Sequence, residues 1–217
     1  ADAFREEYRP VVRWSMESAK PNAPGTPVFF ISDWHYGEVV VPEQVQGTNR
    51  YDAALAEKRL HRVIQTGTML LKQHLAHGHY PGVVLVLGDE DLVSGEVPPL
   101  VQVQRAARIL ADAVAFLHDE FGKVDLYCVP GNHGRLTRKP WAKFYAQQNL
   151  DWLVYQLLAD YVRHLPGVVV NAPPVRDMTF TVANRRFRLS HGDQFRGGDG
   201  IIGPLGPVIR GDVRKRV

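Results

Sequence analysis

The sequence predicts an α/β fold of mixed type, with helices outside either one mixed sheet or two packed sheets. Short apolar segments alternate with segments of helical spacing through residues 27–165, as in chains that build parallel strands. The rest of the chain is β-rich, and two apolar segments around Asn184-Arg185 predict a hairpin. We expect a single domain over residues 1–217, with residues 1–26 as an N-terminal extension, because this length suits one domain with a sizeable core.

Each element is predicted from its own pattern. Apolar runs bounded by Gly and Pro predict strands, and apolar residues three and four positions apart predict helices. The Pro98-Pro99 pair and Pro140 each open a helix, since proline is tolerated in the first turn, and Gly122 ends the second helix. We therefore expect strands at 28–32, 82–88, 124–130 and 168–170, helices at 60–78, 98–122 and 140–164, and hairpin strands at 178–182 and 187–190.

The charge of the chain is uneven along its length. The net charge is +3, but residues 1–130 carry 12 Lys and Arg against 17 Asp and Glu, whereas residues 131–217 carry 14 against 6. A basic second half suits a polyanionic substrate, although a solvated surface with a basic tail has the same composition. No apolar run is long enough to span a membrane, and the single Cys128 excludes an internal disulfide and favours a cytoplasmic setting.

Three short polar motifs each follow one of the first three predicted strands. The carboxyl ends of strands in an open α/β sheet meet at one edge, where ligands bind. The motifs would therefore bring two Asp, two His and one Asn together, a mixture of oxygen and nitrogen ligands that suits a pair of divalent cations. Each motif alone also fits a turn or a helix N-cap, but their succession favours a shared site. The motifs are Asp33-Trp34-His35, Gly88-Asp89 and Gly131-Asn132-His133.

These residues resemble the calcineurin-like metallophosphoesterases over residues 27 to about 200. The motifs of that family are Asp-x-His, Gly-Asp, Gly-Asn-His, a His after a strand, and Gly-His-x-His. The first four look like Asp33-x-His35, Gly88-Asp89, Gly131-Asn132-His133 and His191. The stretches 131–135 and 191–198 look most like members encoded by bacteriophages. The resemblance implies a mixed β sandwich flanked by helices.

The resemblance also implies the roles of the site residues. Asp33 and His35 would bind a first metal ion, Asp89 would bridge two ions, and Asn132 and His191 would bind the second. The ions would be Mn²⁺, with Fe or Zn as alternatives, because mixed nitrogen and oxygen ligation does not fix the metal. In that family a bridging hydroxide attacks the phosphorus in line.

Two further residues would act on the substrate. The resemblance implies that His133 is not a ligand but would face the scissile phosphate, stabilise charge on the leaving oxygen and protonate it. Arg135 is our candidate phosphate clamp, because the guanidinium matches the geometry of phosphate, and a surface role is its alternative.

One motif of the family is missing, since Gly-His-x-His occurs nowhere in the 217 residues. We interpret this absence as C-terminal truncation. A degenerate site is one alternative, and His191-x-Asp193 as a variant of the last motif is another.

The sequence thus predicts a metal-dependent hydrolase that cleaves phosphodiester bonds in nucleic acid or nucleotides and has no membrane partner. The alternatives are a phosphomonoesterase using the same site and a non-catalytic binding module with a degenerate metal site. Trp34 and Tyr36 flank a ligand and would shape the substrate entrance. Five aromatic residues after the third motif would either stack on bases or pack helices, with packing favoured: Trp141, Phe144, Tyr145, Trp152 and Tyr155.

Overall fold

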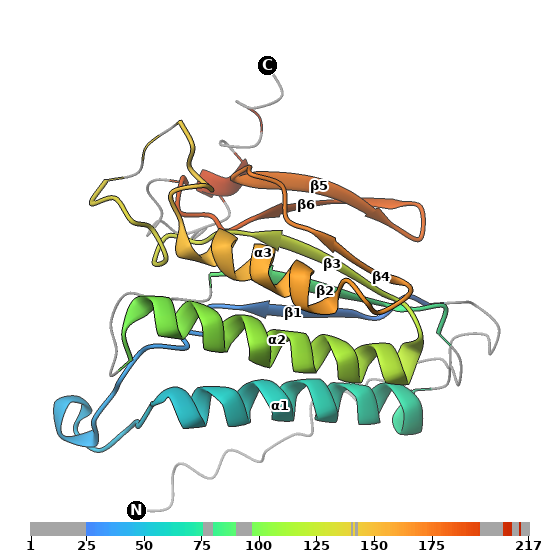
Figure 1. The fold of residues 1–217 in the computed structure, drawn as a ribbon, viewed down its shortest axis with the longest axis horizontal. Coiled ribbons are helices and arrows are strands. Elements are labelled where there is room, and N and C mark those ends of the chain that lie inside the picture. Colours follow the sequence, from blue (N-terminus) through green and yellow to red (C-terminus); the bar gives the residue numbers. More distant parts are fainter. Residues whose placement is uncertain are drawn as a thin grey trace, which may run out of the picture.

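The computed structural model describes residues 25–75, 80–89, 97–139, 141, 143–195, 206–209 and 213. Within them the chain forms a four-stranded parallel sheet in the order β1-β2-β3-β4 and a two-stranded antiparallel sheet of β5 and β6 (Figure 1). The strands are β1 (Val28–Ser32), β2 (Val83–Gly88), β3 (Val124–Val129), β4 (Val168–Asn171), β5 (Asp177–Val182) and β6 (Arg185–Ser190). The helices are α1 (Ala53–Met69), α2 (Pro99–Phe121) and α3 (Leu150–Val162), with a 3₁₀ turn at Pro42–Val45 and a π-helical turn at Leu70–His74.

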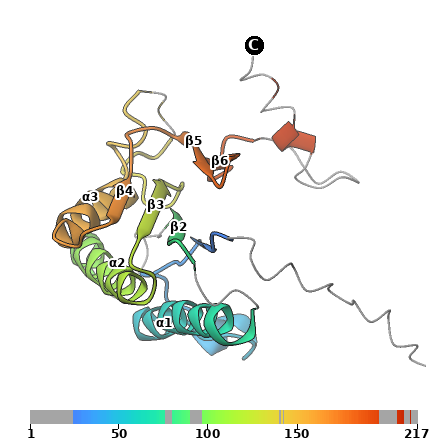
Figure 2. The ribbon, with the colours of Figure 1, turned by 90° about the vertical axis from the view of Figure 1, so that its right-hand side faces the viewer.

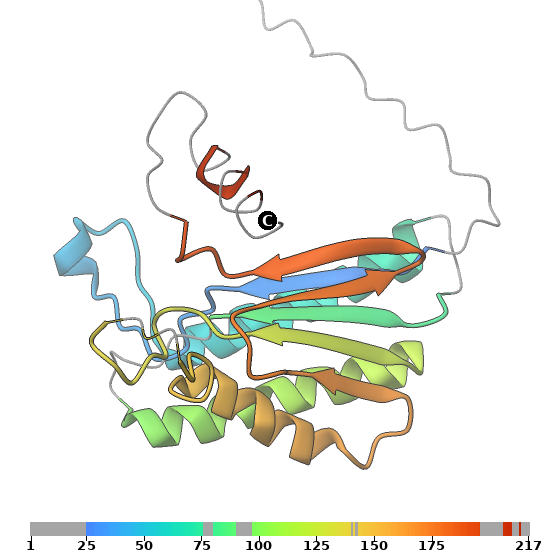
Figure 3. The same cartoon turned by 90° about the horizontal axis from the view of Figure 1, so that it is seen from above.

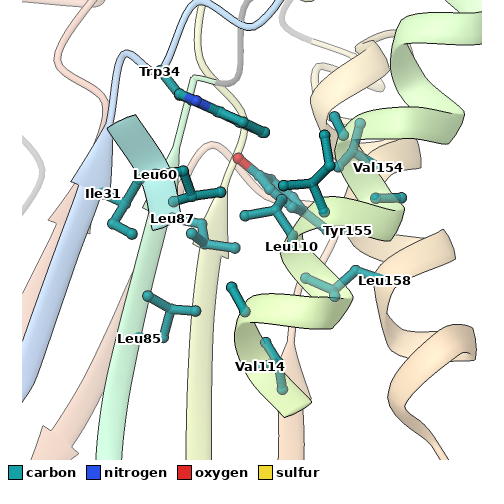
Figure 4. Close-up of a cluster of buried hydrophobic side chains, with 14 of the residues drawn as sticks. Ile31, Trp34, Leu60, Leu85, Leu87, Leu110, Val114, Val154, Tyr155 and Leu158 are labelled. Carbon is teal, nitrogen blue, oxygen red and sulfur yellow. The ribbon is translucent and has the colours of Figure 1, made fainter. Parts of the chain in front are cut away.

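The described elements form three layers. Figure 2 shows α1, α2 and α3 on one face of the parallel sheet and the β5–β6 hairpin on the other. The larger core lies between the sheet and the helices, where Leu85 and Leu87 face Leu110 of α2 and Tyr155 of α3 (Figure 4). Because β2 is covered on both faces, all six of its residues are buried, which explains its unbroken apolar sequence.

The register of the parallel sheet aligns the three strand ends. Ser32 pairs with Gly88, and Gly88 pairs with Val129, so β1, β2 and β3 end side by side. The backbone N–H of Asp33 also donates to the Gly88 carbonyl at 3.0 Å, which continues the pairing past the end of β1. The residues after these strands therefore leave the sheet at one edge.

The hairpin packs on the second face through a smaller core. Phe180 stacks on Tyr127 of β3, with ring centroids 4.0 Å apart, and Leu189 packs against Val84 and Val86. Ala183 and Asn184 at the turn both have positive φ (46° and 65°), as a two-residue type I′ turn requires. This turn fixes the register that brings His191 to the end of β6.

The α/β fold class predicted from the sequence is confirmed, with two packed sheets rather than one mixed sheet. The predicted helix over 140–164 is wrong at its start, because α3 begins at Leu150. The Asn149 side chain accepts from the Asp151 N–H at 2.8 Å and caps α3, and residues 143–148 form turns. The first helix begins at Ala53 rather than Leu60, because the Asp52 side chain caps it by accepting from the Leu55 N–H at 2.8 Å.

The N-terminal 24 residues, Pro140 and the end of the first predicted helix at 76–78 lie outside the described residues. Among the residues described, no helix combines the length and the apolar composition that crossing a bilayer requires.

We expect Leu85→Ala to lower the free energy of unfolding by about 2–5 kcal/mol, because the side chain is fully buried between the sheet and the helices. Phe30→Ala is the control, since Phe30 lies on β1 but is 65% exposed, and should change stability by no more than about 0.5 kcal/mol. Urea unfolding followed by circular dichroism measures both values. Equal losses in the two variants would contradict the position of this core.

Candidate metal centre

The backbone at the ends of β1 and β2 has an uncommon conformation. Asp33 and His35 both have φ of 53°, and Asp89 has φ of 61°. Residues with a side chain seldom adopt this left-handed region, and Asp, Asn and His tolerate it best. Three predicted metal ligands therefore occupy strained positions, as residues at functional sites often do.

Asp89 lies at the centre of the site. Its side chain is fully buried, and its Oδ2 lies 2.7 Å from His133 Nδ1 and 3.4 Å from His191 Nε2. Its Oδ1 accepts from the backbone N–H of His133 at 3.3 Å. A buried carboxylate is costly unless donors or cations surround it, and here two imidazoles meet it.

Two groups of ligand atoms share the Asp89 carboxylate. One comprises His35, Asp89 and His133, the other Asp33, Asp89 and His191, and within each group the atoms lie within 4.8 Å of one another. The Asn132 Oδ1 joins the second group by accepting from His191 Nε2 at 2.7 Å. The donor set of carboxylate, imidazole and amide fits divalent cations, which are the metals such mixed ligands bind.

All five predicted metal ligands and His133 thus come together, but the grouping differs in two respects from the expected one, because His133 joins His35 and Asp33 joins His191. His133 bonds Asp89 directly and lies edge-on to His35, with ring centroids 5.1 Å apart. His35 Nε2 and Asp33 Oδ1 are 4.0 Å apart, so this predicted pair also stands close. The assignment of each residue to one ion stays a prediction.

Glu38 belongs to the site although the Asp33-Trp34-His35 motif does not include it. Its Oε2 lies 2.8 Å from His35 Nδ1, and its backbone N–H donates to the His35 carbonyl at 3.0 Å in a tight turn. A carboxylate on one ring nitrogen fixes the tautomer and presents the other nitrogen to a metal. The acidic side chain three residues after His35 was the available signal in the sequence.

The start of α3 supports the third motif. The Gly131 N–H donates to the buried Asp151 Oδ2 at 2.9 Å, and Asn149 Nδ2 and the Tyr145 hydroxyl donate to the Gly131 carbonyl at 2.8 and 3.1 Å. A Cβ at Gly131 would lie 2.1 Å from the Asp89 carboxyl carbon, so the close approach requires glycine. The sequence analysis missed this support because it placed 149–151 inside a helix that began at Pro140.

Arg135 lies on the loop that follows the motif, and its Nε donates to the Thr137 carbonyl at 2.9 Å rather than to a residue of the metal cluster. Asp193 is paired with Arg176, at 2.7 Å, and shares the Tyr145 hydroxyl hydrogen with the Gly131 carbonyl, at 3.3 Å from the hydroxyl oxygen. Burial raises the pKa of the Tyr145 phenol well above its usual value, so the phenol stays a neutral donor. These contacts occupy Asp193 away from the cluster and do not favour His191-x-Asp193 as a ligand pair.

Trp34 and Tyr36 do not line an entrance, because both side chains are buried in the main core. The Trp34 indole donates to the Ala56 carbonyl of α1 at 2.9 Å, and the Tyr51 hydroxyl donates to the Trp34 carbonyl. The predicted role at the entrance is therefore wrong. The Trp34 ring instead fixes the segment that carries Asp33 and His35 against α1.

Residues 26–201 match the family of calcineurin-like phosphoesterases. The chain belongs to this family. It is a phosphoesterase hydrolase, and the grouped Asp and His side chains agree with the metal dependence of phosphoester hydrolysis in the family. Comparison of the phosphoesterase with curated proteins and with solved structures found no match.

We expect Gly131→Ala in the phosphoesterase to weaken the binding of divalent metal roughly 10-fold or more, because the added Cβ would displace the Asp89 carboxylate. Gly25→Ala is the control, since no atom lies within 4 Å of its Cβ. Titration calorimetry with Mn²⁺ measures the affinity. Unchanged affinity in Gly131→Ala would show that Asp89 does not need this clearance.

Glu38→Ala should lower the metal affinity of the phosphoesterase by about 10- to 100-fold, because His35 would lose the carboxylate that orients its ring. Glu38→Gln, whose amide oxygen still accepts a hydrogen bond, should lose less. Glu43→Ala, which removes an acid from the nearby 3₁₀ turn, serves as the control in the same titration. A loss in Glu43→Ala equal to that in Glu38→Ala would point to general charge rather than to orientation.

Proposed function

We propose that the phosphoesterase hydrolyses phosphodiester bonds in nucleic acid or nucleotides, using two divalent metal ions. The proposal rests on one observation, that the buried Asp89 carboxylate belongs to both groups of ligand atoms. A carboxylate shared in this way has an oxygen for each of two ions.

We propose the division of ligands between two ions that the family motifs imply. Asp33 and His35 would hold one ion, Asn132 and His191 would hold the other, and Asp89 would contribute to both. His191 Nε2 lies 2.7 Å from the Asn132 oxygen and would bind an ion through its lone pair, since a metal takes imidazole through an unprotonated nitrogen. We propose Mn²⁺, with Fe or Zn as alternatives. When bound, the ions would supply positive charge to the phosphoryl oxygens and lower the pKa of a bound water to near neutrality.

His133 acts on the substrate in this proposal. Its side chain is 43% exposed, whereas that of His191 is 10% exposed, so His133 is the more accessible imidazole. A water oxygen attacks phosphorus and its proton passes to solvent, the bond from phosphorus to the leaving oxygen breaks, and that oxygen takes a proton from Nε2 of His133. The hydrogen bond from Nδ1 to Asp89 holds the ring in position for this transfer.

The choice of a diester rests on charge. Residues 131–217 carry eight more basic than acidic side chains, and Arg135 lies two residues after His133. Its bond to Thr137 uses Nε, and its two terminal nitrogens match the oxygens of a phosphate. The resemblance of 131–135 and 191–198 to phage-encoded members also favours a nucleic-acid substrate.

Hydrolysis of bis-p-nitrophenyl phosphate and p-nitrophenyl phosphate with Mn²⁺ tests the proposal. We expect diesterase activity that falls about 10²- to 10⁴-fold in His133→Ala, because the leaving oxygen would lose its proton donor. His61→Ala, which removes an exposed imidazole on α1, should leave the activity unchanged.

Other outcomes would overturn the proposal in different ways. Activity on the monoester alone would indicate a phosphomonoesterase. Full activity in His133→Ala would remove His133 from the mechanism. No hydrolysis and no bound metal would leave a non-catalytic binding module.

A further inference from the structure

The loop between Gly134 and Asn149 exposes two large aromatic side chains. We call its described residues, 135–139, 141 and 143–148, the rim loop. Trp141 is 59% exposed and Phe144 is 65% exposed. The other aromatic residues of this part of the chain are engaged in the fold, since Tyr145 and Tyr155 are buried and the Trp152 indole donates to the Ala172 carbonyl.

The conformation of the rim loop keeps one of these rings outside. Phe144 has φ of 55°, in the left-handed region that is strained for a bulky residue. Its neighbour Tyr145 points inward, where its hydroxyl donates to the Gly131 carbonyl. The Phe144 carbonyl also accepts from the Gln148 N–H at 3.0 Å. Phe144 therefore combines a strained backbone with an exposed apolar ring, and neither feature stabilises the folded state.

The rim loop is strongly basic. It carries four basic residues, and no Asp or Glu occurs anywhere between Gly134 and Asn149 in the sequence. None of the ion pairs between described residues includes any of the four. Uncompensated positive charge beside exposed aromatic rings is the combination that binds single-stranded nucleic acid. The four are Arg135, Arg138, Lys139 and Lys143.

The base of the rim loop is joined to the metal centre. The Leu150 N–H donates to the Gly134 carbonyl at 2.7 Å, and Leu136 N–H donates to the Gln148 carbonyl at 2.9 Å. Arg135 pairs with Asn149 in an antiparallel bridge, so the loop is closed directly after His133. Figure 3 shows this loop, in yellow, beyond the ends of β1, β2 and β3, where the ligand groups lie.

We propose that the rim loop binds single-stranded nucleic acid next to the scissile diester. Trp141 and Phe144 stack on bases, and the four basic side chains bind phosphates. A duplex would not serve as well, because its bases are already stacked on one another and do not offer their faces. Cleavage of the bound strand rests on the proposed phosphodiesterase function, but binding does not, since neither stacking nor the pairing of basic side chains with phosphates requires a metal.

The test is fluorescence anisotropy of a labelled oligothymidylate in EDTA, which removes metal and prevents cleavage. We expect Trp141→Ala and Phe144→Ala each to weaken binding roughly 5- to 150-fold, the usual effect of removing one stacked base. Phe30→Ala is the matched control, because Phe30 has the same side chain as Phe144 and is equally exposed on β1. It should bind like the unmodified chain.

Charge is tested in the same assay at several salt concentrations. The Lys139→Ala/Lys143→Ala variant should reduce the slope of log affinity against log salt by about 0.7 for each phosphate that the variant no longer neutralises. Lys58→Ala/Arg62→Ala removes two exposed basic residues from α1 and should leave the slope unchanged.

Three results would overturn the proposal: Trp141→Ala and Phe144→Ala binding like Phe30→Ala, a duplex of the same length binding as tightly as the single strand, or no binding of either. Hydrolysis of bis-p-nitrophenyl phosphate separates this failure from failure of the proposed function. If the chain hydrolyses the small diester but does not bind oligothymidylate, only the rim-loop proposal fails. If the chain binds oligothymidylate but hydrolyses neither bis-p-nitrophenyl phosphate nor oligothymidylate, only the phosphodiesterase proposal fails.

Discussion

The burial of one carboxylate governs the arrangement of the site. Asp89 directly follows β2, the strand whose residues are all buried, and its own side chain has no contact with solvent. Imidazoles from two other segments must therefore reach it, and the backbone of Gly131 must pass close enough to exclude a Cβ. Asp151, itself buried, holds that backbone in place. The sheet register, Gly131 and the start of α3 together surround this one charge with protein groups in place of solvent.

The sequence predicted the parts of the site that depend on local pattern. Strand ends in a parallel sheet meet at one edge, so the positions of Asp33, Asp89 and Asn132 after three strands predict that they lie together. Glu38 and Asp151 escaped prediction because their roles depend on distances across turns. The helix expected from Pro140 failed for a related reason, since periodic spacing does not show that Asn149 caps α3 at a later position.

The aromatic residues after the third motif show another limit of sequence. Stacking on bases and packing in a core demand the same residue types, so composition alone could not separate them. The structure divides them by direction, with Tyr145 and Tyr155 inward and Trp141 and Phe144 outward. Trp34 and Tyr36 were expected at the substrate entrance but are buried in the core. Residues beside a predicted ligand can also attach its segment to the core.

The left-handed backbone at three predicted ligands restricts how this centre can change through evolution or redesign. Asp33, His35 and Asp89 occupy conformations that Asn and Gly also tolerate, but that β-branched residues resist. Replacement of Asp89 by Asn therefore alters charge at little backbone cost, whereas Val or Thr there would disturb the chain itself. Substitution at these predicted ligands is thus limited to the few residue types that tolerate a left-handed backbone.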